Sequence, residues 1–489
     1  MLGIDVGTTG CKVGVYRVDG KRLALASRRY GVDVTRLGWA EQDPLVVLDA
    51  MVESVRQIDA CLRADVVVAA LSVQGEALIF VDGPGRPVRP AILGMDRRAI
   101  VEARELLSGR ERHWLYERTG QPVSPLYPLA KWIWLSRHEP ETLRRASGVR
   151  FYEDFIGETL TGRAVVSASL ASRTQWASLE PGQWDGEILD AFGVDDTKLS
   201  AVQEGGRVVG PILPAWALRL GVGMGTMLAS GGHDQACAAL GTGLVDEGDV
   251  LLSTGTAEVV MRASRTPVLR EDWEEHLIST YRHARSGRYL VLGLNHTAGA
   301  VVEWLVRQLG SRDVDDAYGP LMEMVARQPG RIFAVPRFLG LDEGRGAATG
   351  AFFGLDLGVG KGDLLRAVIE GLGYEVRRLV ECMALGQESV GRVVQVGGGA
   401  KSNIWTEIKA DILGVEIHRT EDTEAALLGA ARLGAEAVGL EMASLQTPES
   451  AVGDTAVAPV AAYAALHARR YAKYRELLRR VALIERDLA

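Results

Sequence analysis

A short segment near the N-terminus carries the residues of an anion cradle. Residues 5–12 read Asp-Val-Gly-Thr-Thr-Gly-Cys-Lys. Its two glycines allow the backbone to turn sharply and approach a ligand closely. Thr8 and Thr9 supply hydroxyl and N–H donors, and Lys12 adds a positive charge, a combination that suits a phosphate. An ordinary glycine-threonine hairpin turn would have the same pattern, so the segment alone leaves both interpretations open.

A second turn of the same kind occurs about 250 residues later. Residues 253–256 read Ser-Thr-Gly-Thr and lie between the apolar runs 250–252 and 259–261, which we expect to be strands. Gly255 and Thr256 would then be counterparts of the first turn. Two strand–turn–strand units this far apart indicate that the chain has two related halves.

A third turn consists largely of glycine. Residues 397–403 read Gly-Gly-Gly-Ala-Lys-Ser-Asn, between a strand-like run at 394–396 and a helical pattern at 405–413. Glycines at a strand-to-helix turn allow a flat nucleotide to lie against the backbone. The chain has no Walker A sequence, because the Gly-Lys-Gly at 360–362 lacks the spaced glycine before it and the serine or threonine after it.

One aspartate stands out as a candidate base. Residues 231–235 read Gly-Gly-His-Asp-Gln and precede a run of small residues at 236–240 that predicts a helix. A carboxylate held near a substrate hydroxyl can act as a general base. Asp234 could equally be a helix N-cap, and His233 a packed or surface histidine.

The elements that must position these residues alternate along the chain. Strand-like runs occupy residues 2–4, 13–18 and 66–73, and helical patterns occupy residues 44–62, 129–136, 363–381 and 458–488. This alternation predicts α/β layers. The stretch 203–232, rich in glycine and proline, predicts the approach to an interdomain boundary.

Composition limits the class of protein. The 489 residues carry a net charge of −8 with no basic run, which argues against a nucleic-acid partner. The four cysteines lie far apart without a Cys-x-x-Cys pair, which predicts reduced thiols in a cytoplasmic protein. No apolar run is long enough to span a membrane, and Asp5 stands where a signal peptide would be apolar. At roughly 150 residues per domain, the length predicts two to four domains.

Taken in order, these segments resemble one family. They are accompanied by Trp-Ala-Glu-Gln-Asp-Pro at 39–44, Arg-Pro-Ala-Ile-Leu at 89–93, Lys-Trp-Ile-Trp at 131–134 and Leu-Thr-Gly at 160–162. Over residues 2–435 the chain resembles the FGGY carbohydrate kinases, a group that includes xylulokinase, ribulokinase, gluconate kinase and glycerol kinase. The resemblance implies two ribonuclease-H-like domains of the actin/hexokinase superfamily with a cleft between them. We expect the first domain, residues 1–235, to hold the sugar, and the second, residues 236–489 with a helical tail, to bind ATP.

The resemblance also implies roles for individual residues. Asp234 would be the general base, and Asp5 would carry Mg²⁺ through water. The remaining expected contacts are with ATP: Thr8, Thr9 and Lys12 at the transferring end, Gly255 and Thr256 at the phosphates, and Gly299, Glu303, Gly399 and Asn403 around the nucleotide. Glu303 stands where glycerol kinase has a glutamine.

For the acceptor, the resemblance points to Gln74, Gly75 and Glu76, together with Asp234 and Gln235. Glu76 fits the Arg-Glu pair of glycerol kinases, whereas Gly75 fits neither that pair nor the Met-His pair of xylulokinases. Two further positions, Leu126 and Ser167, also depart from the family pattern. A glutamate accepts hydrogen bonds from hydroxyls and repels a carboxylated sugar.

We therefore expect an ATP-dependent kinase for a small neutral sugar or polyol, with a ketopentose such as xylulose or ribulose favoured. Glycerol or another short polyol is the alternative acceptor. An actin-like ATP-binding switch without sugar kinase activity is the alternative of another class. By analogy with such families, a homodimer is an open alternative to a monomer, with no nucleic-acid or membrane partner.

Overall fold

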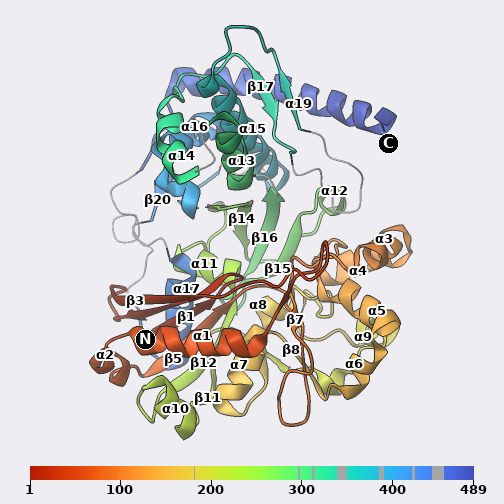
Figure 1. The fold of residues 1–489 in the computed structure, drawn as a ribbon, viewed down its shortest axis with the longest axis vertical. Coiled ribbons are helices and arrows are strands. Elements are labelled where there is room, and N and C mark those ends of the chain that lie inside the picture. Colours follow the sequence, from red (N-terminus) through yellow and green to blue (C-terminus); the bar gives the residue numbers. More distant parts are fainter. Residues whose placement is uncertain are drawn as a thin grey trace.

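The molecule is built around two large sheets, one in each half of an elongated shape (Figure 1). A computed structural model describes residues 1–180, 182–295, 298–310, 314–338, 350–384, 390–420, 424–442 and 456–488. Each sheet has six strands. The first belongs to the N-terminal half of the chain and the second to the C-terminal half.

The first sheet has the strand order β11-β12-β5-β1-β2-β3. Its strands are β1 (Leu2–Val6), β2 (Gly10–Tyr16), β3 (Arg22–Arg29), β5 (Val68–Val73), β11 (Val208–Pro211) and β12 (Met227–His233). Strands β1, β2 and β3 form an antiparallel meander, while β5 runs parallel to both β1 and β12. The carboxyl ends of β12, β5 and β1 therefore meet at one edge.

The second sheet repeats this arrangement in the order β15-β16-β14-β13-β19-β20. Its strands are β13 (Val250–Thr254), β14 (Glu258–Ser264), β15 (Ser279–Arg282), β16 (Tyr289–Asn295), β19 (Val393–Val396) and β20 (Ile417–Arg419). Strand β13 is antiparallel to β14 and parallel to β19, as β1 is to β2 and β5. The predicted α/β class and the two related halves are confirmed.

Short strands and helices complete the chain. The short strands are β4 (Glu41–Gln42), β6 (Ile79–Val81), β7 (Ala91–Ile92), β8 (Gly148–Arg150), β9 (Val165–Ser167), β10 (Ala201–Gln203), β17 (Phe333–Val335) and β18 (Ala351–Phe353). The helices are α1 (Pro44–Gln57), α2 (Ala60–Ala64), α3 (Ile100–Ser108), α4 (Glu111–Thr119), α5 (Pro128–His138), α6 (Pro140–Arg145), α7 (Tyr152–Thr161), α8 (Ala168–Ala171), α9 (Gly186–Phe192), α10 (Pro214–Leu220), α11 (Asp234–Gly241), α12 (Glu271–Glu275), α13 (Gly299–Leu309), α14 (Val314–Glu323), α15 (Lys361–Cys382), α16 (Asn403–Leu413), α17 (Ala425–Ala437) and α19 (Ala461–Leu488).

The predicted helix at 44–62 is interrupted in the structure. Helix α1 ends at Gln57, because Ile58 adopts an extended conformation and the side chain of Asp59 caps the separate helix α2. All four cysteines have free thiols. Among the described residues, no helix combines the length and the apolar character that crossing a membrane requires.

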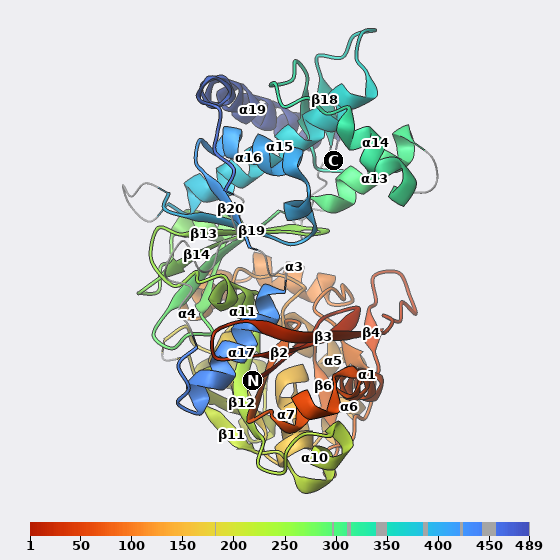
Figure 2. The same cartoon turned by 90° about the vertical axis from the view of Figure 1, so that its left-hand side faces the viewer.

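Helix α17 leaves the C-terminal half of the chain and packs on the first sheet. Leu427, Leu428 and Ala431 of α17 are buried in one cluster with Val68 and Ala70 of β5. Helix α11 lies beside α17, and both views place the pair in the half that contains the first sheet (Figures 1 and 2). Helix α19 lies at the opposite end of the molecule. The domain boundary after residue 235 stays a prediction.

The packing of α11 against α17 depends on glycine. A Cβ atom on Gly429 would lie 1.9 Å from the carbonyl oxygen of Cys237, and one on Gly241 would lie 1.9 Å from that of Ala425. Contacts this short with backbone atoms cannot be relieved by a side-chain rotation. The two helices must therefore separate if either glycine acquires a side chain.

We predict that Gly429→Ala lowers the free energy of unfolding by about 1–2 kcal/mol, since an overpacking cost of up to roughly 3 kcal/mol outweighs the gain of roughly 1 kcal/mol in helix propensity. Thermal and denaturant unfolding would measure it. The matched control is Gly186→Ala in the first turn of α9, where an added Cβ meets nothing within 4 Å. Equal stability of the two variants would contradict the packing argument.

Candidate active site

Three carboxylates gather at the carboxyl edge of the first sheet. Asp5 is the next-to-last residue of strand β1, Glu76 follows β5, and Asp234 follows β12 directly. The registers pair Asp5 with Ser72, and His233 with Val73, so the three strands end at the same level. Ligands of open α/β sheets bind at this edge.

Asp234 is the first residue of helix α11, and its side chain is 30% exposed. It is not the N-cap, a position held by His233. Its Oδ1 accepts a hydrogen bond of 2.6 Å from the Gln235 N–H. Burial, and next the negative charge of Asp5, raise the pKa of Asp234 to about 7. A carboxylate with such a pKa exchanges protons readily near neutral pH.

Asp5 is the second acidic group of this edge. Its Oδ1 accepts a hydrogen bond of 2.7 Å from the Ser72 hydroxyl, and burial raises the pKa of Asp5 to about 6. The charge of Asp5 in turn raises the pKa of Asp234, and a pair of carboxylates with raised pKa values fits a divalent cation. Mg²⁺ is commonly held by one or two carboxylates together with substrate phosphates. No cluster of three or more potential ligands occurs among the residues that the structure describes.

Two side-chain hydrogen bonds fix the backbone of the turn between β1 and β2. The Tyr30 hydroxyl donates to the Gly7 carbonyl at 2.6 Å, and Gln42 Nε2 donates to the Thr8 carbonyl at 2.9 Å. These bonds fix two carbonyl groups that would otherwise repel an anion. Lys12 lies on β2, and its Nζ is 2.7 Å from a carboxylate oxygen of Glu424, just before α17.

The turn between β13 and β14 forms a platform for helix α13. The N–H of Gly299 donates to the Gly255 carbonyl at 3.0 Å, and that of Ala300 donates to the Thr256 carbonyl at 3.2 Å. A Cβ atom on Gly299 would lie 2.6 Å from the Gly255 carbonyl oxygen. The structure thus brings three of the predicted nucleotide residues together.

A buried ion pair supports this platform. Lys409 Nζ bonds the Glu258 carboxylate and, at 2.8 Å, the Thr254 hydroxyl, which itself donates to Glu258 at 2.6 Å. The charged side chains of Lys409 and Glu258 are fully buried. They hold the last residue of β13 immediately before Gly255.

The other residues predicted to contact the nucleotide lie in three different surroundings. Gly399 packs against the same platform, since a Cβ atom there would lie 2.3 Å from Thr254 Cγ2. Asn403 Oδ1 accepts a hydrogen bond of 2.7 Å from Arg419. The Glu303 side chain is 54% exposed and lies 3.5 Å from Arg307 on α13.

Beside Glu76 lies an arginine that the sequence analysis missed. Arg173 Nε and Nη2 lie 2.8 and 2.7 Å from Glu76 Oε1. Its Nη1 donates to Gln121 Oε1 at 3.0 Å and to the Ser279 hydroxyl of β15 at 3.1 Å. The guanidinium also lies 5.1 Å from the ring centroids of Tyr127 and Tyr281. No spacing signal in Ala-Ser-Arg-Thr marks this residue, because its partners come from three distant segments.

The two carboxylate oxygens of Glu76 have different surroundings. Its backbone has a φ of 66°, a left-handed conformation that costs a non-glycine residue energy and is typical of functional positions. Oε1 is held by Arg173, whereas Oε2 has no partner among the described residues. A Cβ atom on Gly94 would lie 3.0 Å from Oε2. The glycine therefore keeps space beside the free oxygen.

Two family models together match most of the chain. The N-terminal domain model of the FGGY family of carbohydrate kinases matches residues 1–241, and the C-terminal domain model matches residues 250–438. The chain belongs to the FGGY family of carbohydrate kinases. It is therefore an enzyme that phosphorylates a sugar or a related small molecule.

Individual FGGY kinases resemble the chain along most of its length. It is 28% identical to a xylulose kinase of Staphylococcus xylosus over 436 residues, which cover 88% of this chain and 89% of the relative. A xylulose kinase of Escherichia coli is 29% identical over 88% of both chains. The crystal structure of a xylulose kinase of Lactobacillus acidophilus superposes with a TM-score of 0.91 and 23% identity, covering 100% of this chain and 99% of the other, which shows the shared fold.

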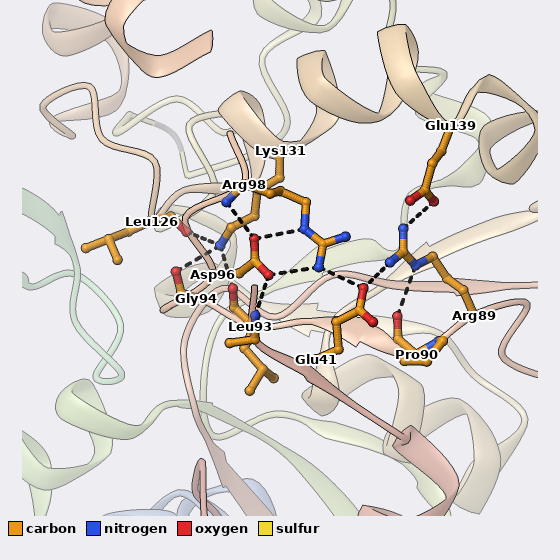
Figure 3. Close-up of polar contacts among 11 residues, drawn as sticks. Glu41, Arg89, Pro90, Leu93, Gly94, Asp96, Arg98, Leu126, Lys131 and Glu139 are labelled. Carbon is orange, nitrogen blue, oxygen red and sulfur yellow. Dashed lines mark hydrogen bonds and ion pairs between the residues drawn. The ribbon is translucent and has the colours of Figure 1, made fainter. Parts of the chain in front are cut away.

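In this FGGY kinase a buried lysine fixes the loop that lies beside Glu76. Lys131 Nζ donates to the carbonyls of Leu93, Gly94 and Leu126 at 2.7, 3.0 and 2.6 Å (Figure 3). Burial lowers the pKa of Lys131 to about 8. The carbonyl of Leu126 thus helps to hold the Lys131 ammonium group in place. Lys131 in turn fixes the loop that carries Gly94 beside Glu76.

A chain of ion pairs continues from this loop. Figure 3 shows Asp96 bonded to Arg98, Arg98 to Glu41, and Glu41 in turn to Arg89. Asp96 also accepts a hydrogen bond of 2.6 Å from the Ala40 N–H. The network connects β4 with the loop after β7, so the position of this loop depends on ion pairs that are largely buried.

A serine at position 167 can donate hydrogen bonds to a buried carboxylate, whereas an aspartate there would repel it. Its hydroxyl donates to Glu153 Oε2 at 2.6 Å, and its N–H donates to the same oxygen at 2.9 Å. Burial raises the pKa of Glu153 to about 7. An aspartate at position 167 would add a second carboxylate against the first, which is a physical reason for the serine.

We predict that Lys131→Met lowers the free energy of unfolding by about 3 kcal/mol or more, because three carbonyls lose their buried donor at roughly 1–3 kcal/mol each. The acceptor KM should rise as the Gly94 loop relaxes. Unfolding curves and initial rates measure both effects. Lys21→Met, at an exposed lysine in the turn before β3, is the control and should change neither.

We also predict that Asp234→Asn stabilises the protein in a pH-dependent manner. The raised pKa means that the native state resists ionisation at Asp234, whereas in the unfolded state the group ionises near pH 4. The wild-type protein therefore loses stability as the pH rises from about 4 to about 7. The variant avoids this loss and should be about 1–3 kcal/mol more stable at pH 8, with a smaller difference at pH 5.

Thermal midpoints of both proteins across this pH range give the measurement. The control is Asp246→Asn, at an exposed aspartate without a hydrogen bond or ion pair in the described chain. A difference at Asp234 that is independent of pH would contradict the raised pKa.

Proposed function

We propose that this FGGY kinase is an ATP-dependent xylulose kinase that phosphorylates a terminal hydroxyl of the ketose, with Asp234 as general base. The proposal rests on the edge of the first sheet, where a partly open carboxylate with a pKa of about 7 lies within the electrostatic influence of Asp5 and Glu76. The xylulose kinases among its relatives support the choice of acceptor.

The transfer requires one proton and one phosphoryl group to move. As the acceptor oxygen attacks the γ-phosphorus of ATP, its hydroxyl proton passes to the Asp234 carboxylate. The bond between the γ-phosphorus and the β–γ bridging oxygen breaks, and ADP leaves with that electron pair. A base with a pKa near the working pH combines the ionised state with sufficient proton affinity.

The two turns would hold the ATP. We assign Thr8, Thr9 and Lys12, with Gly255 and Thr256, to the phosphates. Around the adenosine we place Gly299, Glu303, Gly399 and Asn403. Asp5 is the residue that would hold Mg²⁺, which when bound supplies charge neutralisation at the phosphates. Since Lys12 is paired with Glu424, a phosphate there competes with that carboxylate.

The acceptor would lie beside Gln74, Gly75 and Glu76. Glu76 Oε2 can accept a hydroxyl hydrogen bond, and Gln235 Oε1 is a buried acceptor without a partner in the described chain. A neutral ketose or polyol satisfies both groups. An aldonate would place its negative charge near Glu76 and Asp234, which opposes binding.

Glycerol or another short polyol is the second candidate acceptor, favoured by the single free oxygen of Glu76. An actin-like nucleotide switch would need the two turns but has no use for Glu76 and its buried Arg173. ADP release measured with and without acceptors separates these functions.

We predict that Asp234→Ala lowers kcat on xylulose by about 10²–10⁴-fold while ATP still binds, because a general base contributes in this range. A coupled ADP-release assay over xylulose, ribulose, glycerol, xylitol and gluconate gives rates, and equilibrium titration gives ATP affinity. Asp246→Ala is the matched control and should retain full activity.

Full activity of the Asp234→Ala variant would contradict the assignment of Asp234 as the general base. Turnover of glycerol or gluconate in preference to xylulose would overturn the acceptor. ATP hydrolysis at the same rate without any acceptor would favour the nucleotide switch.

A further inference from the structure

Gly75 is the acceptor residue that family resemblance leaves unexplained, and its surroundings show what a side chain there would meet. A Cβ atom on Gly75 would lie 2.7 Å from Nε2 and 2.9 Å from Cδ2 of His233. Real Cβ atoms do not approach a ring this closely. The imidazole of His233 therefore occupies the space that a side chain at position 75 would fill.

His233 is held firmly in that space. It is 5% exposed, and its ring packs edge-on to Tyr281 with centroids 5.7 Å apart. Its backbone N–H donates to the Ser169 hydroxyl at 3.2 Å. Burial, and next the charge of Arg173, hold the pKa of His233 well below its usual value. The imidazole is therefore neutral and carries a single N–H.

The position of that proton follows from the surroundings of the two ring nitrogens. Nδ1 is buried and has no partner in the described part of the chain. An N–H left unpaired inside a protein costs more than an unpaired lone pair. Nε2 lies 3.2 Å from Asp234 Oδ1. The proton is therefore best placed on Nε2, the ring nitrogen that faces the Asp234 carboxylate.

The two oxygens of Asp234 are consequently unequal. Oδ1 accepts from the Gln235 N–H at 2.6 Å and faces His233 Nε2 at 3.2 Å. Oδ2 has no partner among the described residues. The other charged groups acting on this carboxylate are Asp5 from β1, Glu76 after β5 and Arg173 after α8. None of these donates a hydrogen bond to it.

We infer that His233 is a positioning residue that, with the Gln235 N–H, anchors Oδ1 of Asp234 and so leaves Oδ2 to take the proton of the acceptor, and that Gly75 is the residue that makes room for it. This inference rests on the proposed function of Asp234 as general base. It identifies the reacting oxygen and gives Gly75 a steric role.

The first test replaces the imidazole while keeping a ring. His233→Phe retains packing on Tyr281 but has no donor, and we expect kcat to fall about 10- to 100-fold, the value of a hydrogen bond to a charged group. The acid limb of the kcat/KM profile should move to higher pH, because the ionised carboxylate loses a donor. His233→Gln retains a donor and should recover most of the activity and the wild-type acid limb.

The second test examines the steric pair. Gly75→Ala should displace the imidazole and lower kcat about as much as His233→Phe. In a His233→Ala background the added methyl group has room, so Gly75→Ala should then cost nothing further. Gly186→Ala is the control glycine. Thermal midpoints of all variants show whether each remains folded.

Several outcomes would overturn the inference while leaving the base itself in place. One is a His233→Phe variant that keeps wild-type kcat and acid limb while Asp234→Ala is inactive. A Gly75→Ala effect of equal size in both backgrounds would exclude the steric pair. Failure of the proposed function is distinguished by turnover in Asp234→Ala, whatever the behaviour of His233.

Discussion

The burial of acidic side chains at one edge of a sheet is the constraint on which the candidate site depends. Three neighbouring parallel strands deliver Asp5, Glu76 and Asp234 to one edge of a sheet. Each carboxylate is held by a different donor: Ser72 for Asp5, Arg173 for Glu76 and a backbone N–H for Asp234. Only Glu76 receives a full positive charge. The other two keep raised pKa values, which is the condition that a proton acceptor and a cation ligand share.

The two halves use one strand arrangement for opposite chemistry. At the carboxyl edge of the first sheet the chain places acids. At the corresponding edge of the second it places Gly255 and Gly399, and Gly399 packs against Thr254, the residue before Gly255. Acids suit a hydroxyl and a cation, whereas backbone N–H groups suit phosphates. Under the proposed function, the duplicated fold would thereby supply the two complementary surfaces that joining a hydroxyl to a phosphate requires.

Much of this arrangement could be predicted from local patterns. Apolar runs and glycine-threonine turns predicted strands β1, β2 and β5 of the first sheet and β13, β14 and β19 of the second. They also placed Asp5 after a strand and Asp234 before a helix. What escaped prediction depends on contacts between distant segments. Arg173 joins Glu76 to a strand of the other half, and His233 acquires its meaning only beside Gly75. The helix predicted at 44–62 was too long, because a single extended residue and an aspartate cap interrupt it.

The position of α17 bears on how the polypeptide is made. One face of the first sheet is covered by a helix that ends at residue 437, some 200 positions after the sheet's last strand. At about 5–20 residues per second, a ribosome needs on the order of ten seconds or more to supply that cover. During this interval the apolar surface of β1, β5 and β12 stays uncovered on the nascent chain. The N-terminal half cannot reach its final packing until translation is nearly complete.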